Sequence, residues 1–76
     1  MTKARRAKLN AVIEVLRTLK DNVEEILDEE DTAMSNMPES LQESDRYYAM
    51  EDACDSMSDA MDAIDEAIDS LESAVE

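Results

Sequence analysis

The stretch that decides the fold is residues 47–75, YYAMEDACDSMSDAMDAIDEAIDSLESAV. Its apolar residues recur at alternating spacings of three and four, and they are Tyr47, Met50, Cys54, Met57, Met61, Ile64, Ile68, Leu71 and Val75. This heptad pattern predicts an α-helix with one side packed against another helix. Alanine precedes the a positions, at Ala53, Ala60, Ala67 and Ala74, so we expect a neighbouring helix to approach closely.

A second helix is predicted over residues 3–31. Its seam alternates by three and four through Leu9, Val12, Leu16, Leu19, Val23 and Ile26. Ile13 and Leu27 add apolar width beside this seam, and a wide stripe indicates more than one neighbouring helix.

Between the two helices, residues 32–40 lose the acidic helical pattern, and Pro38 disfavours helix at the residue before it. Ser40 and Glu43 have the spacing of a capping box, which predicts that the second helix begins near residue 41 and runs to residue 75. The fold class is therefore all-α: one domain over residues 1–76, built as an antiparallel two-helix hairpin with heptad seams.

A turn near Pro38 sets the predicted alignment of the hairpin. Three facing pairs follow from it: Leu9 with Ile68, Leu16 with Met61, and Val23 with Cys54. The same alignment predicts ion pairing between Arg5, Arg6 and Lys8 on the first helix and Asp65, Asp69 and Glu72 on the second.

Self-association is expected, because a lone pair of helices buries little apolar surface and the single cysteine provides no internal disulfide. A homodimer of hairpins that forms a four-helix bundle would cover both stripes. The predicted oligomer core consists of Leu9, Val12, Leu16, Leu19, Val23, Ile26, Met50, Cys54, Met57, Met61, Ile64, Ile68 and Leu71.

Composition narrows the functional classes. The chain has no Gly, Trp, Phe or His, so histidine chemistry and aromatic stacking platforms are excluded. The start lacks the apolar stretch of a signal peptide, no apolar run approaches a membrane-spanning length, and one cysteine fits a reducing compartment. We expect a cytoplasmic protein with no membrane partner, no cofactor and no metal.

Charge is segregated along the chain. Residues 1–20 carry +5, residues 21–31 carry −7 and residues 32–76 carry −12, for a net charge of −14. Such an excess of negative charge repels nucleic acid and attracts basic protein surfaces. The basic N-terminal residues could touch nucleic acid, but their charge is more simply used against the second helix, so no nucleic-acid partner is expected.

Two acidic patterns bear on catalysis and metal binding. Residues 24–28 (EEILD) with residues 66–69 (EAID) resemble the paired acidic helices of all-α nucleotide pyrophosphohydrolases, which hold Mg²⁺, but here the acids fall on the solvated face. A calcium loop starting at Asp28 would end at Glu39, but it has Ala33 where glycine is needed. No enzymatic activity is predicted.

Other single residues have simple structural interpretations. Cys54 is expected to be a buried small hydrophobe, and Met50, Met57 and Met61 to fill the core, although methionines also form adaptable binding grooves. Tyr48 lies outside the seam and beside Arg46, which makes it a candidate contact residue.

Residues 36–42 (NMPESLQ), followed by residues 44–47 (SDRY) and the acidic alanine-rich heptads, resemble small acidic helical proteins of phages and prophages of Gram-positive bacteria. The resemblance covers residues 34–76. It implies an origin in a mobile element and no enzymatic activity, and it brings no site with it.

Two functions follow as hypotheses. The first is a non-enzymatic oligomeric binding protein, such as a phage-encoded inhibitor or modulator of a host or defence protein, that offers an acidic surface to a basic protein surface. Its predicted partner-binding residues are Asp28, Glu29, Glu30, Asp31, Glu39, Glu43, Arg46 and Tyr48. The alternative is a structural assembly or scaffolding coiled coil whose charge is only a solvated face.

Overall fold

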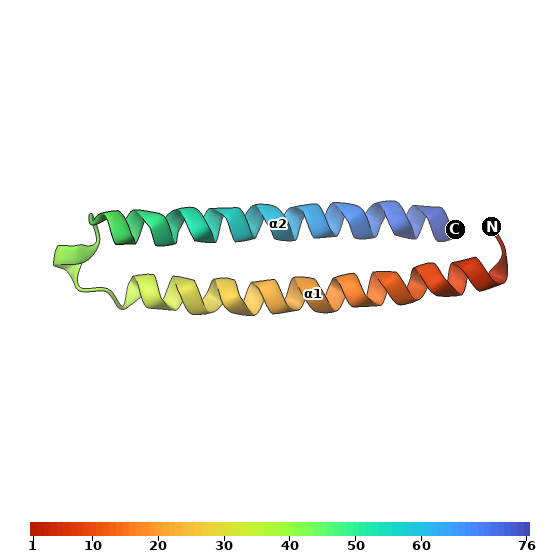
Figure 1. Cartoon of the computed structure of the whole chain (residues 1–76), viewed down its shortest axis with the longest axis horizontal. Coiled ribbons are helices and arrows are strands. Elements are labelled where there is room, and N and C mark those ends of the chain that lie inside the picture. Colours follow the sequence, from red (N-terminus) through yellow and green to blue (C-terminus); the bar gives the residue numbers. More distant parts are fainter.

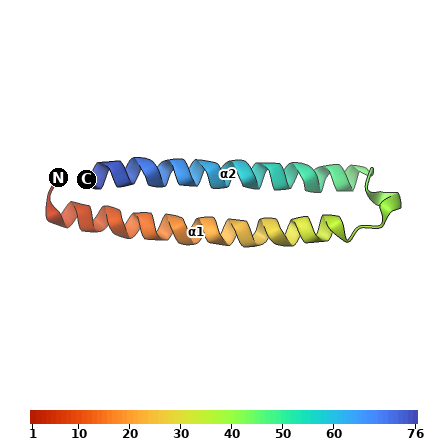
Figure 2. The ribbon, with the colours of Figure 1, turned by 180° about the vertical axis from the view of Figure 1, so that it is seen from behind.

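The computed structural model describes residues 1–76 and confirms an all-helical hairpin. Helix α1 spans Lys3–Ser35, a short 3₁₀ turn η1 spans Glu39–Leu41, and helix α2 spans Asp45–Val75. Figure 1 shows the two long helices side by side and antiparallel, and the view from behind in Figure 2 agrees. The molecule is a rod with extents of 59 × 15 × 12 Å.

Helix α1 begins where Thr2 caps it, because the Thr2 hydroxyl accepts a hydrogen bond from the Arg5 backbone N–H at 3.2 Å. It continues beyond the predicted end at residue 31 as far as Ser35. Burial explains the extra turn: Met34 is only 8% exposed and its sulfur lies 3.7 Å from the Cys54 sulfur. The helix stops before Met37, the residue whose helical conformation Pro38 disfavours.

Ser44, rather than Ser40, caps α2. The Ser44 hydroxyl accepts a hydrogen bond from the Tyr47 backbone N–H at 3.3 Å and lies 2.6 Å from the Leu41 carbonyl, to which it donates. Residues Glu39–Leu41 form the 3₁₀ turn instead of the first turn of the helix. The capping box predicted from Ser40 and Glu43 is therefore wrong, and the second helix starts at Asp45.

The seam of α2 is confirmed, because all nine of its predicted residues are buried or half-buried. The seam predicted for α1 is wrong in part. Val12, Leu19 and Ile26 are 47%, 47% and 54% exposed, whereas Ile13 is only 4% exposed. The observed seam of α1 runs through Leu9, Ile13, Leu16, Lys20, Val23, Leu27, Glu30 and Met34.

The predicted alignment of the two helices is also wrong. Met34, rather than the predicted Val23, contacts Cys54, and Figures 1 and 2 show that α2 begins slightly beyond the end of α1. At the other end α1 extends past the last residue of α2, as Figure 1 shows. The predicted pairing of Arg5, Arg6 and Lys8 with α2 is absent, because Arg17 pairs with Glu72 and Lys20 pairs with Asp65.

We expect Ser44→Ala to lower the free energy of unfolding by about 1 kcal/mol, because the Tyr47 N–H loses its acceptor in the first turn of α2. The matched control is Ser40→Ala, which removes an exposed hydroxyl outside both long helices and is expected to change stability by less than about 0.5 kcal/mol. Urea unfolding followed by circular dichroism measures both variants. A larger loss for Ser40→Ala than for Ser44→Ala would contradict the observed start of α2.

Candidate functional site

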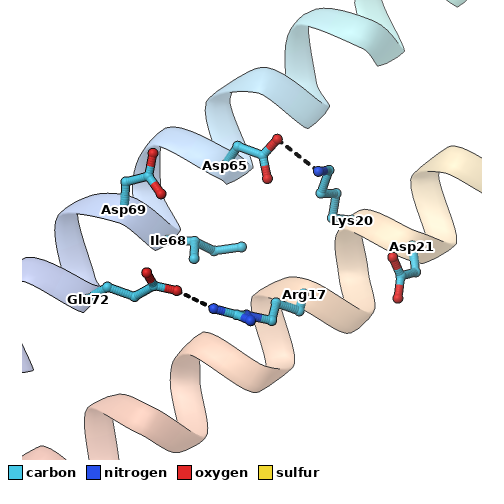
Figure 3. Close-up of a pocket in the computed structure, with 7 residues that line it drawn as sticks. All are labelled: Arg17, Lys20, Asp21, Asp65, Ile68, Asp69 and Glu72. Carbon is cyan, nitrogen blue, oxygen red and sulfur yellow. Dashed lines mark hydrogen bonds and ion pairs between the residues drawn. The ribbon is translucent and has the colours of Figure 1, made fainter.

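Two ion pairs cross the hairpin on one side of its seam. Arg17 pairs with Glu72, and the Lys20 ammonium lies 2.8 Å from an Asp65 carboxylate oxygen. Figure 3 shows the side chain of Ile68 between these two pairs, on the floor of a shallow hollow. Both cations that line the hollow are already paired, and Asp21 and Asp69 add further negative charge to its rim. The hollow is therefore poorly suited to an anionic ligand.

The hydrogen bond from Lys20 to Asp65 raises the pKa of Lys20 above its ordinary value of 10.5; desolvation opposes this effect, and the charges of Asp65, Glu24 and Asp21 add to it. A raised lysine pKa means that folding favours the ammonium form. The stabilising effect of the pair is therefore fully present at neutral pH and is lost only as the pH rises through the raised pKa. Lys20 occupies a seam position, where a paired polar residue helps to specify the alignment of two helices.

The ion pairs divide the surface of the rod into two faces. Arg17 comes directly after the seam residue Leu16 in the sequence, and Glu72 comes directly after the seam residue Leu71. Because Arg17 and Glu72 pair with each other, the residues that come directly after seam residues on the two helices lie on the same side of the rod. We call this side the charged face. Its exposed or half-buried charged residues are Glu14, Arg17, Asp21, Glu24, Asp28, Asp31, Glu51, Asp55, Asp62, Asp65, Asp69 and Glu72.

The positions that immediately precede the seam lie on the opposite side, which we call the neutral face. From residue 12 to residue 26 of α1 they are Val12, Val15, Leu19, Asn22 and Ile26, and from residue 49 of α2 they are Ala49, Ala53, Ser56, Ala60, Ala63, Ala67, Ser70 and Ala74. The charged residues that precede the seam, Lys8, Glu29 and Arg46, lie beyond the ends of these two stretches. All of these residues are exposed. The sequence alone singles out four of these residues, Ala53, Ala60, Ala67 and Ala74. The complete neutral face, including Val15 on α1, can be defined only when the observed seam of α1 is known.

The predicted partner-binding residues lie in two groups at the end of the rod that carries the connection. Asp28 and Asp31 are on the charged face. Glu29 is on the same side of α1 as the neutral face, and Glu30 is half-buried in the seam. The second group lies on the connection and in the first turn of α2, and it consists of Glu39, Glu43, Arg46 and Tyr48.

Tyr48 is 51% exposed and packs edge-on against Tyr47, with ring centroids 6.2 Å apart. Leu41, on the connection, is also exposed. This end of the rod therefore combines carboxylates with two large exposed side chains that can contact apolar surface.

Cys54 is buried, and its thiol faces the Met34 sulfur. Burial raises the pKa of the Cys54 thiol, and the negative charges of Asp31, Glu30 and Asp55 raise it further. A thiol in this environment is a packing group, because the thiolate is the reactive form.

No protein family, curated protein or solved structure matches the chain. Neither helix has a stretch that is both long and apolar enough to cross a membrane. The acidic side chains nowhere converge in a group of three or more that could hold a metal ion. The features open to a partner are the neutral face, the charged face and the acidic residues around the connection.

We expect Cys54 to be alkylated by iodoacetamide at pH 8 at least about tenfold more slowly than an exposed cysteine, because both burial and the raised pKa reduce the accessible thiolate. The matched control is Ser58→Cys in a Cys54→Ala background, since Ser58 is exposed and also lies on an acidic stretch of α2. Mass spectrometry of timed samples gives both rates. Equal rates in the folded proteins would show that Cys54 is not protected by the seam.

Proposed function

We propose that the protein is a non-enzymatic, self-associating binding protein that engages a basic protein surface through its acidic end. We define the acidic end by the acids of the last turns of α1, the connection and the first turns of α2. These residues are Asp28, Glu29, Glu30, Asp31, Glu39, Glu43, Asp45, Glu51, Asp52 and Asp55.

One observation carries this proposal: none of the acids of the acidic end takes part in an ion pair. Both ion pairs of the hairpin use Asp65 and Glu72, which lie outside it, and Arg46 is the only basic residue in the region. Unpaired charge of one sign at the tip of a rod steers oppositely charged partners and speeds their association. The exposed side chains of Tyr48 and Leu41 supply apolar contact area within the same region.

The resemblance of the connection to phage and prophage proteins supports a more specific form of the proposal. The protein would then be an inhibitor or modulator of a host or defence protein, acting by covering a basic surface. Many nucleic-acid-binding sites are basic surfaces of this kind. An acidic rod would compete with nucleic acid for such a site without any catalytic step.

The neutral face favours a second candidate function, that of a structural assembly coil. Val12, Val15, Leu19 and Ile26 are exposed on one side of α1 and are uncharged, so they could mediate assembly with no further partner. In this case the acidic end would only keep the assembly in solution.

We expect the triple variant Glu39→Lys, Glu43→Lys, Asp52→Lys to lose capture of its partner, because it places cations where the proposal needs anions. The matched control is Asp59→Lys, Asp62→Lys, Glu66→Lys, which makes the same change in net charge on exposed positions of α2 outside the acidic end. Immobilised parent and variants are compared in extract of a Gram-positive bacterium, at low and physiological salt, with quantitative mass spectrometry.

The parent and the control should retain the same proteins, with retention falling as salt rises, while the acidic-end variant retains none of them. Circular dichroism must show that both variants are as helical as the parent. If both triple variants capture as the parent does, or if the parent retains only itself, the assembly function is the better description.

A further inference from the structure

The neutral face leaves large apolar side chains without a neighbour. Val15 is 58% exposed, and Val12, Leu19 and Ile26 are about half exposed, whereas only four residues of the whole chain are buried. A hairpin with so small a core needs further burial to be stable. Four of the seven large apolar residues that are exposed lie in this row on α1.

The part of the neutral face on α2 suits close packing. From Ala49 to Ala74 every position there is Ala or Ser, so the backbone of α2 is not screened by long side chains. The distance between packed helices depends on the side chains at their contact, and small residues allow a short one. A partner that contacts α1 through large residues can therefore also contact α2.

Charges at the two ends of the row on α1 identify the partner. Lys8 immediately precedes the seam residue Leu9, so it continues the row at its start, and Glu29 immediately precedes Glu30 and continues it at its end. Between them, from Val12 to Ile26, the row contains no charge and only one polar residue, Asn22. Neither ion pair of the hairpin uses Lys8, which is exposed.

A row that is basic at one end, apolar in the middle and acidic at the other end is complementary to itself when reversed. An antiparallel copy brings Lys8 to Glu29 at both ends of the contact, because a two-fold axis repeats every interaction. A parallel copy brings Lys8 to Lys8 and Glu29 to Glu29, and it also places the two acidic ends together. Repulsion between like charges disfavours this second arrangement.

We propose that a second copy of the chain covers the neutral face, with α1 antiparallel to α1 of the partner subunit and Lys8 of each copy beside Glu29 of the other. This inference rests on the self-association included in the proposed function, and Glu29 is the only residue that its contact shares with the acidic end.

A charge swap tests the arrangement. Lys8→Glu should weaken the dimer about tenfold or more, because it places like charges together at two symmetric contacts. Glu29→Lys should also weaken it, although this change lowers the net negative charge and would strengthen any dimer limited only by general repulsion. The double variant Lys8→Glu, Glu29→Lys should restore the parent affinity, since it reverses both pairs and leaves the net charge unchanged.

Glu14→Lys is the control, because it makes the same charge change as Glu29→Lys but on the charged face, and it should not weaken the dimer. Sedimentation equilibrium over a range of concentrations gives the dissociation constants. Strengthening by Glu29→Lys, failure of the double variant to restore affinity, or a parent that is monomeric throughout would overturn the proposal.

Spin labels report the orientation directly. In a Cys54→Ala background, a label at Thr18→Cys, near the middle of α1, should give a short distance between the two copies. A label at Ser40→Cys, on the connection, should give a long distance comparable with the 59 Å length of the rod. A short distance at residue 40 would mean that the two connections lie together. This result would support self-association but contradict the antiparallel arrangement. Capture of a basic partner is measured separately, so its loss would not affect this result.

Discussion

The contact between Met34 and Cys54 sets how far α1 is shifted along α2, and the position of every charge follows from that shift. Side chains in a heptad seam interlock, so one fixed pair determines all the others. Because Met34 is buried opposite Cys54, Lys20 meets Asp65 and Arg17 meets Glu72. Asp65 and Glu72, two of the acids predicted to bind Arg5, Arg6 and Lys8, are therefore paired with other cations, and neither ion pair uses a cation from the first turns of α1.

The seam also separates the rod into faces of different character. Residues that follow the seam are mostly charged, and those that precede it between Val12 and Ile26, and along α2, are apolar or small. Most of the acids thus lie away from the neutral face, where solvent and salt screen their repulsion. Between Val12 and Ile26 on α1, and from Ala49 to Ala74 on α2, the opposite side is free of charge, which favours its burial against another helix pair.

The unbroken repeat of residues 47–75 was sufficient to predict the hairpin and the complete seam of α2. The seam of α1 was harder to predict, because apolar residues occur on this helix both in the seam and beside it. The positions that are actually buried or half-buried also include two charged residues, Lys20 and Glu30. A charged residue argues against a seam position unless its partner is known, and Asp65 is far away in the sequence. The start of α2 was misplaced for a related reason: Ser40 and Glu43 have the spacing of a capping box, but Ser44 lies next to the residues that pack. The acidic residues around the connection were evident from charge alone, whereas the neutral face depends on the seam and therefore on the tertiary contact.

The two proposed surfaces are compatible in geometry, and their combination has a consequence for binding. An antiparallel dimer that uses the neutral face buries the middle of α1 and leaves the connections at opposite ends of the assembly. Each connection carries an acidic end, so the dimer presents two identical binding surfaces that point away from each other. Two such surfaces on a rigid rod bind two sites on one partner with an effective concentration set by the rod, provided that the sites match its length. A partner with a single basic site gains no such advantage, so the dimer favours oligomeric or repetitive partners over monomeric ones.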